Sequence, residues 1–200
     1  MIWDLAYRSA AILAVFASAS FADCPKRVDG VNGILLTRTQ PFFSSLYKAT
    51  ATGLSESRVM VKGGATEEVS ATYLHALAPQ DRISAKNTVS LHYTEPVAAL
   101  DDLPRTKVWQ SAVSVFVGAV LAMEGTVTMT LIGTDEVSLG PCHYPVWKVE
   151  DRLVLGEDDG TYFLQYYAPE LGLVVASIKM GADGKPINGV QFDTIEIGQD

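Results

Sequence analysis

Side chains able to carry out catalysis are few and widely spaced in this sequence. The only histidines are His75, His92 and His143, and no Gly-x-Ser-x-Gly motif is present. Covalent hydrolysis needs a nucleophile, a base and an orienting acid in contact. His92 lies between Ser90 and Thr94 on the polar side of an alternating run, which indicates a solvated strand residue. We therefore predict no catalytic residue. The alternative is a periplasmic hydrolase that uses dispersed carboxylates or His92.

Neighbouring acidic residues are the second candidate for chemistry. They occur as Glu67-Glu68, Asp101-Asp102, Glu150-Asp151 and the run Glu157-Asp158-Asp159. Paired carboxylates support glycoside hydrolysis, but doublets in turns or at strand ends are typical of solvated surface. The ligand spacing of a calcium loop is missing. Zinc sites use clustered Cys and His, and only Cys142-His143 is local. We predict no metal site and no cofactor.

One dense aromatic group stands out in the C-terminal half of the chain. It comprises Tyr144, Trp147, Tyr162, Phe163, Tyr166 and Tyr167. Alternation places Tyr162 and Tyr166 on one face of a strand, with Trp147 on a neighbouring strand. Such a stripe could form the floor of a groove for a lipid, a peptide strand or a glycan. We predict Trp147, Tyr162 and Tyr166 as ligand-binding residues. The alternative is that the stripe belongs to the core of the sheet.

The N-terminal segment has the composition of a cleavable secretory signal peptide, over residues 1–22. One cation, Arg8, precedes an apolar run without charge, and a small-x-small cleavage pattern ends at Ala22. The apolar run is too short to span a bilayer. The alternatives are an uncleaved N-terminal helix and a lipoprotein lipidated at Cys24, where an acidic residue precedes the cysteine instead of a small one. We expect residues 23–200 to form a single periplasmic or secreted domain without a membrane span.

Charge and cysteine content restrict the partners and the compartment. The formal net charge is −8, and an acidic surface is repelled by the phosphates of nucleic acids. We therefore predict that the protein does not bind nucleic acid. The two cysteines are Cys24 and Cys142. An even number in an exported protein predicts one disulfide, which would tie the start of the domain to its C-terminal half.

Apolar and polar residues alternate through much of the chain, which predicts a mainly β fold. The clearest run is 126–131, where Val127, Met129 and Leu131 share one face. Similar runs occur at 89–94 and 174–180, and a last run has a phase shift that a bulge near Thr194 would explain. Gly- and Asp-rich turns separate the runs; they are Lys62-Gly63-Gly64, Glu157-Asp158-Asp159-Gly160 and Gly181-Ala182-Asp183-Gly184. Residues 143–197 are predicted to form an antiparallel meander.

Two segments depart from this pattern. Residues 94–106 contain two prolines and Asp101-Asp102, which favours a linker or long loop. The apolar residues of the segment Val108–Met123 fit both the periodicity of a helix and the alternation of a strand. Trp109 and Phe116 fall on one helical face, whereas alternating valines fit a strand. Its length favours a helix packed on the sheet, and we expect that helix at about 108–123.

The C-terminal half resembles a pattern of exported bacterial proteins of unknown function. The resemblance is carried by the stretches Ile132-Gly133-Thr134-Asp135-Glu136-Val137, Cys142-x-Tyr144-x-Val146-Trp147-x-Val149 and Tyr166-Tyr167-Ala168-Pro169-Glu170-Leu171-Gly172. In those proteins a strand ends in a tyrosine, turns through Pro-x-x-Gly and enters another strand. The resemblance implies a curved antiparallel sheet, similar to the half-barrels of periplasmic lipoprotein carriers. It assigns no catalytic residue.

These observations together favour a non-enzymatic periplasmic protein. We expect a curved antiparallel sheet or half-barrel that binds an apolar or extended ligand, or that docks on an envelope partner. The partner classes predicted are a lipid, a peptide or an envelope protein. Besides the hydrolase, the remaining alternative is a structural accessory of an envelope assembly.

Overall fold

The runs of alternating apolar and polar residues form strands. The structure is a computed structural model that describes residues 24–157 and 160–198. Its strands are β1 (Ile34–Arg38), β2 (Phe43–Thr50), β3 (Gly53–Lys62), β4 (Ala65–His75), β5 (Ala78–Ile83), β6 (Thr88–Tyr93), β7 (Val108–Val117), β8 (Val120–Leu139), β9 (Cys142–Leu155), β10 (Thr161–Ala168), β11 (Leu173–Met180), β12 (Pro186–Gln191) and β13 (Thr194–Ile197). The helical segments are η1 (Arg27–Val31), η2 (Val97–Asp102) and α1 (Leu103–Thr106). The predicted signal peptide, residues 1–22, lies outside the described residues.

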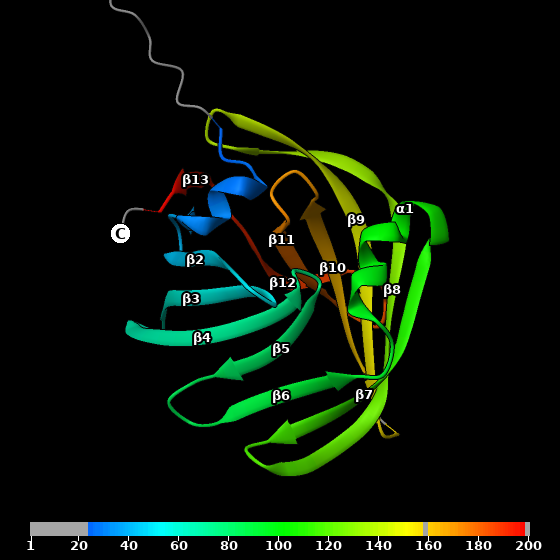
Figure 1. The fold of residues 1–200 in the computed structure, drawn as a ribbon. Helices are drawn as coiled ribbons and strands as arrows, with labels where there is room; N and C mark the ends of the chain where they lie inside the picture. Colours follow the sequence, from blue (N-terminus) through cyan, green and yellow to red (C-terminus); the bar gives the residue numbers. More distant parts are fainter. Residues whose placement is uncertain (1–23, 158–159, 199–200) are drawn as a thin grey trace, which may run out of the picture.

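All thirteen strands belong to one antiparallel sheet, in which β1 to β11 each pair with the next strand along the chain. The sheet curves strongly about a central axis (Figure 1), so that we call it an open barrel. The predicted curved antiparallel sheet is therefore confirmed. The turn predicted at Lys62–Gly64 joins β3 to β4, and the Pro169–Gly172 turn joins β10 to β11. Gly172 has a φ of +67°, a left-handed conformation that glycine adopts at low cost.

The predicted helix at about 108–123 is wrong. Residues 108–117 are β7, Gly118 turns the chain with a φ of +62°, and β8 begins at Val120. Along β7, Trp109, Val113 and Val115 are buried and their neighbours are more exposed, which is the period of a strand. Pairing with β6 on one side and β8 on the other satisfies the backbone of β7. This pairing and the β-branched side chains favour a strand, and they outweigh the length of the apolar segment, which favoured a helix.

Helical structure occurs instead in the segment expected to be a linker. η2 and α1 together span residues 97–106. Leu100 and Leu103 are fully buried, and they belong to the same core cluster as Val127 and Met129 of β8. This short helical segment therefore packs against the inner surface of the sheet.

The two edges of the sheet, β12 and β13, are consecutive in the chain. β12 pairs with β11, whereas β13 pairs with β1, so the chain crosses from one edge to the other through Phe192 and Asp193. The backbone N–H of Asp193 donates to the Thr37 carbonyl at 2.7 Å, and Arg38 Nη1 donates to the Gly189 carbonyl at 2.9 Å. The phase shift near Thr194 is this crossing and not the expected bulge.

A disulfide joins Cys24 to Cys142 at the start of β9, as predicted, across 118 positions of sequence. Next to it, Tyr144 Oη donates to the Pro25 carbonyl at 2.9 Å, and the Arg27 N–H donates to the Glu170 carbonyl at 2.8 Å. These contacts fix the N-terminal segment of the described chain against the β9 and β10 region. Across the described residues, no helix has the length and apolar character needed to cross a membrane.

Candidate functional site

The concave side of the open barrel forms a cavity of about 760 Å³ that is open to solvent on one side. Side chains from β1 to β6 and from β8 to β12 line it, and most of them are apolar, for example Phe43, Leu91, Met129 and Phe163. A cavity of this size and character lies within the range that small-molecule sites occupy in proteins. Three groups of its polar side chains lie on β2 to β4, on β4 to β6, and on β9 with β10, and further polar side chains of the lining are Arg38, Ser177 and Asn188.

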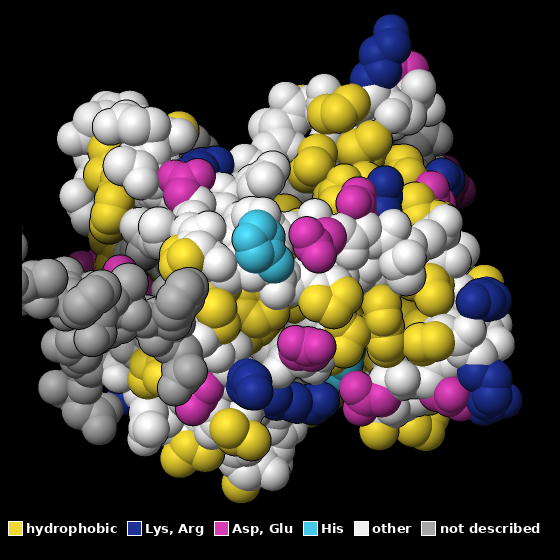
Figure 2. Space-filling view, turned by 90° about the horizontal axis from the view of Figure 1, so that it is seen from above, with side chains coloured by type: hydrophobic (Ala, Val, Ile, Leu, Met, Phe, Trp, Pro, Cys, Tyr) yellow, Lys and Arg dark blue, Asp and Glu magenta, His cyan; other side chains and the backbone are white. Residues whose placement is uncertain are grey.

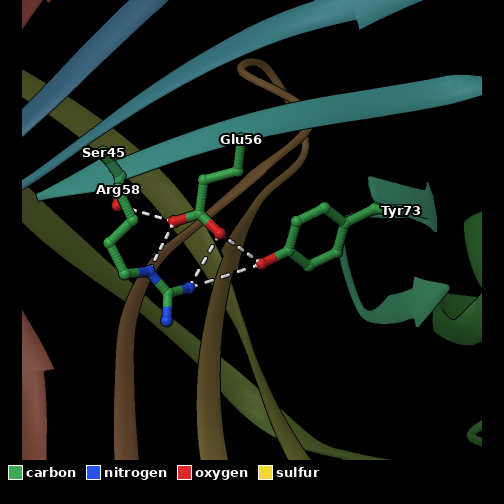
Figure 3. A network of polar contacts seen from close by, with 4 residues as sticks. All are labelled: Ser45, Glu56, Arg58 and Tyr73. Carbon is green, nitrogen blue, oxygen red and sulfur yellow. Dashed lines mark hydrogen bonds and ion pairs between the residues drawn. The ribbon is translucent and has the colours of Figure 1, made fainter. Parts of the chain in front are cut away.

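The first group is centred on Glu56 of β3, whose hydrogen bonds are complete. Glu56 is 2% exposed, and its carboxylate accepts hydrogen bonds from Ser45 Oγ at 2.6 Å and from Tyr73 Oη at 2.6 Å. Arg58 donates from Nε at 3.0 Å and from Nη2 at 2.7 Å (Figure 3). Burial acts to raise the pKa of Glu56, but Arg58 and the hydrogen bonds together lower it below its ordinary value. The network therefore holds an ionised pair and links β2, β3 and β4.

The second group surrounds Asp81 of β5. Its Oδ2 accepts a hydrogen bond from Thr72 Oγ1 at 2.9 Å, and its Oδ1 accepts one from Ser90 Oγ at 2.6 Å. Both carboxylate oxygens thus have hydroxyl partners from the neighbouring strands β4 and β6. Arg82, the next residue, lies 3.9 Å from Glu67. The Asp81 carboxylate therefore lies at the cavity wall, and its hydrogen-bond partners are the hydroxyl groups of Thr72 and Ser90.

The third group is Asp151 of β9 and Gln165 of β10. Gln165 Nε2 donates to Asp151 Oδ2 at 3.3 Å. Asp151 pairs across the sheet with Met129 on one side and Phe163 on the other, and all three line the cavity. Burial raises the pKa of Asp151 to about 6, and the hydrogen bond from Gln165 offsets only part of this effect. Within the described residues, no cationic side chain forms an ion pair with Asp151.

A second hollow, of about 370 Å³, lies beside η1 and η2 and contains a buried histidine. His75 is 7% exposed, and its Nδ1 accepts a hydrogen bond from the Leu77 N–H at 3.2 Å. The proton of the neutral ring is therefore on Nε2, which lies 3.6 Å from Asp101 Oδ1, beyond hydrogen-bond distance. Burial lowers the pKa of His75, although Asp101 acts in the opposite direction. Tyr167 packs against the imidazole ring at 5.1 Å between centroids.

The predicted ligand-binding aromatics lie outside the cavity lining. Tyr162 Oη donates to Glu150 Oε1 at 2.7 Å, and the Arg152 guanidinium lies over its ring. The ammonium group of Lys148 lies over the ring of Tyr166. Their strand neighbours Thr161, Phe163 and Gln165 line the cavity instead.

Trp147 is partly buried and packs against Tyr167, with 5.3 Å between the ring centroids. The structure therefore brings Trp147 next to the buried cluster that includes Met129. It does not bring Trp147 together with Tyr162 and Tyr166 in one lined groove. Ligand binding by these three residues stays a prediction.

The other sequence candidates for chemistry are dispersed. His92 is exposed and packs against Phe116 with the two rings tilted and 4.7 Å between their centroids. His143 Nδ1 lies 2.9 Å from Ser138 Oγ on the hairpin of β8 and β9. Neither histidine lines the cavity. Over residues 24–157 and 160–198, no three Cys, His, Asp or Glu side chains are close enough together to hold a metal ion.

Glu56, Asp81 and Asp151 line the cavity although the sequence pattern did not single them out, and Asp151 was hidden in the doublet with Glu150, which is typical of solvated surface. A signal was present in the alternation. Trp147, Val149 and Leu153 occupy every second position of one strand, and Asp151 interrupts this apolar series. An acidic residue in phase with buried positions is expected to face the interior, because side chains alternate strictly along a strand.

The outer surface carries mixed charge. Figure 2, which views the molecule from above relative to Figure 1, shows hydrophobic patches interrupted by side chains of both charges. Comparison with protein-family models, with curated proteins and with solved structures finds no match to this chain. The candidate site is thus defined by geometry alone: a mostly apolar cavity whose walls carry the Glu56, Asp81 and Asp151 groups.

Proposed function

We propose that this protein is an exported binding protein that holds an apolar, elongated ligand inside the open barrel without changing it chemically. The observation that carries the proposal is the cavity of about 760 Å³ and its mostly apolar lining. Enclosing an apolar ligand removes its surface from water, which contributes roughly 25 cal/mol for each Å² buried. A few polar side chains on the wall then orient the ligand.

An extracytoplasmic location is part of this proposal. The disulfide between Cys24 and Cys142 is of the kind that persists in oxidising compartments such as the periplasm. The predicted signal peptide at residues 1–22 agrees with that location. An envelope protein that delivers or receives the ligand would be the partner of such a carrier.

Fluorescence of N-phenyl-1-naphthylamine, a neutral apolar dye, tests the cavity directly. The protein is expected to bind the dye saturably, with one dye molecule per chain. Ala71 lines the cavity and is buried, so that Ala71→Phe would fill part of the space and weaken dye binding at least ten-fold. Ala122 is exposed on β8, and Ala122→Phe is the matched control that should bind normally.

Folding must be checked, because overpacking a core position costs about 1–3 kcal/mol. Circular dichroism of each variant gives that check. If Ala71→Phe fails to fold, Leu91→Trp provides a second cavity-filling change at a partly exposed lining position. Dye binding that is absent in the unmodified protein, or that survives in every folded cavity-filling variant, would overturn the proposal.

A further inference from the structure

Two carboxylates in the same cavity have very different surroundings. Glu56 receives four hydrogen bonds, two of them from Arg58. Asp151 receives one, from the Gln165 amide, at the long distance of 3.3 Å. β9 and β3 lie on different sides of the open barrel, with β4 to β8 between them in the sheet (Figure 1). The Glu56 network therefore leaves Asp151 without a countercharge.

The cations that line the cavity are engaged elsewhere. Arg58 is paired with Glu56, and Arg82 lies near Glu67. Arg38 donates to the carbonyl groups of Pro41 and Gly189. Each of these arginines has partners from its own region of the wall, and among the described residues none forms an ion pair with Asp151.

Apart from Gln165 and the phenol of Tyr93, which donates to the Pro79 carbonyl, the surroundings of Asp151 are apolar. Val149 and Leu153 flank it in the same phase of β9 and belong to, or pack against, the buried cluster of that wall. Met129 and Phe163 are its partners on the adjacent strands. Charged groups in such surroundings are costly unless a partner compensates them, and burial does raise the pKa of Asp151. Buried carboxylates with perturbed pKa values that line a cavity are candidates for functional groups.

We propose that Asp151, with Gln165 beside it, binds the polar end of the cavity ligand, and that this end is an ammonium group on an aliphatic chain. This inference rests on the proposed function and specifies the class of ligand. An ionised carboxylate only accepts hydrogen bonds, whereas an ammonium group carries three donors. One donor would meet the Asp151 carboxylate, and the Gln165 amide oxygen offers a second acceptor nearby. The aliphatic chain would lie along the apolar wall.

A ligand with a carboxylate end fits this wall poorly. Asp151 would repel it, because two like charges in a low-dielectric site strongly disfavour each other. Such a ligand would have to place its anion near Arg38, which is already bonded to two carbonyl groups. An alcohol can donate one hydrogen bond to Asp151 but leaves the charge uncompensated. The expected order of affinity is therefore amine, then alcohol, then carboxylate.

Three ligands with the same chain test this order: dodecylamine, dodecan-1-ol and dodecanoate. Displacement of N-phenyl-1-naphthylamine at pH 8 measures their affinities for the full chain, below the concentration at which each forms micelles. Dodecylamine should bind about ten-fold or more tightly than dodecan-1-ol, since hydrogen bonds to charged groups are worth more than neutral ones. In Asp151→Asn, amine affinity should fall to that of the alcohol, and alcohol affinity should stay within about three-fold.

Glu150→Gln is the matched control. It removes one carboxylate from the same strand, but Glu150 does not line the cavity and contacts Tyr162 and Arg152. The control should keep the preference for the amine, which shows that net charge alone does not produce it. Equal affinities for the three ligands, or a preference for dodecanoate that Arg38→Gln removes, would overturn the inference while leaving the binding proposal intact. Failure of all three ligands and of the dye would overturn the binding proposal itself.

Discussion

The phenol oxygen of Tyr73 lies 2.6 Å from Oε2 of Glu56 and donates a hydrogen bond to that carboxylate. Burial and the nearby Glu56 charge raise the pKa of Tyr73 above its ordinary value, so the phenol stays protonated as a donor. The contact joins β4 to β3 inside the cavity, where Glu56 also holds Arg58. The Glu56 carboxylate therefore holds strands β3 and β4 of the cavity wall together.

Loss of Glu56 is expected to destabilise the fold. Glu56→Ala leaves the partly buried guanidinium of Arg58 without its carboxylate, which should lower the free energy of unfolding by about 3 kcal/mol. Tyr73→Phe removes one hydrogen bond to a charged group and should cost about 2 kcal/mol. Urea denaturation measures both values. Tyr162→Phe removes a similar bond to Glu150 from a partly buried position and should cost less than about 1 kcal/mol; a cost equal to that of Tyr73→Phe would contradict the role given to burial.

The disulfide is expected to contribute strongly to stability because it closes a long loop. Cys24 and Cys142 are 118 positions apart, and a loop of that length corresponds to about 4–5 kcal/mol in the chain-entropy model. Cys24→Ser, Cys142→Ser and the double variant should therefore unfold at similar, lower urea concentrations. Treatment of the unmodified protein with reductant should reproduce their behaviour. An unchanged midpoint in the double variant would show that the Tyr144–Pro25 contact and its neighbours suffice to hold the N-terminal segment.

Asp151 should make the folded state less stable at neutral pH than in acid. Its pKa rises from 3.8 to about 6 on folding, so between these values the folded state binds more protons than the unfolded state. The cost of burying the charge is fully present above pH 6 and disappears as pH falls below 3.8. A shift of about two units corresponds to roughly 3 kcal/mol. Asp151→Asn should therefore be more stable than the unmodified protein at pH 8, and the difference should vanish near pH 4 in urea titrations.

His75 should produce the opposite dependence. Burial lowers its pKa, so the unfolded state binds its proton more readily, and the contribution of neutral His75 is present above the unfolded pKa of about 6.5. That contribution is lost as pH falls through the lower, folded value. His75→Gln should therefore lose less stability than the unmodified protein between pH 7 and 5. Measurement in the Asp151→Asn background separates the two groups, and parallel pH curves for the two proteins would contradict the assignment to His75.

The strands and turns were accessible from sequence because alternation and turn chemistry are local. Val127 and Met129 share a buried face, as their spacing predicted. The sequence does not indicate which face of β10 lines the cavity, because both faces of this strand carry large apolar or aromatic side chains. Alternation therefore grouped Tyr162 with Tyr166 but could not show that Phe163 and Gln165 are the residues lining the cavity.

Long-range pairing was equally hidden. Nothing local indicates that β1 pairs with β13, or that Phe192 and Asp193 cross between the edges of the sheet. The segment Val108–Met123 was ambiguous because its apolar residues satisfy both the helical and the strand period. Only the partners on either side, β6 and β8, decide between the two.

The crossing between β12 and β13 also determines when the barrel can be completed. In the order of synthesis β1 comes long before β13, and every other ladder of the described sheet joins strands that are adjacent in the chain. Each hairpin can therefore form as soon as its second strand has emerged. One edge of β1, however, has no partner until Thr194–Ile197 has been synthesised. Until then the chain presents an unpaired strand edge, a feature that promotes aggregation.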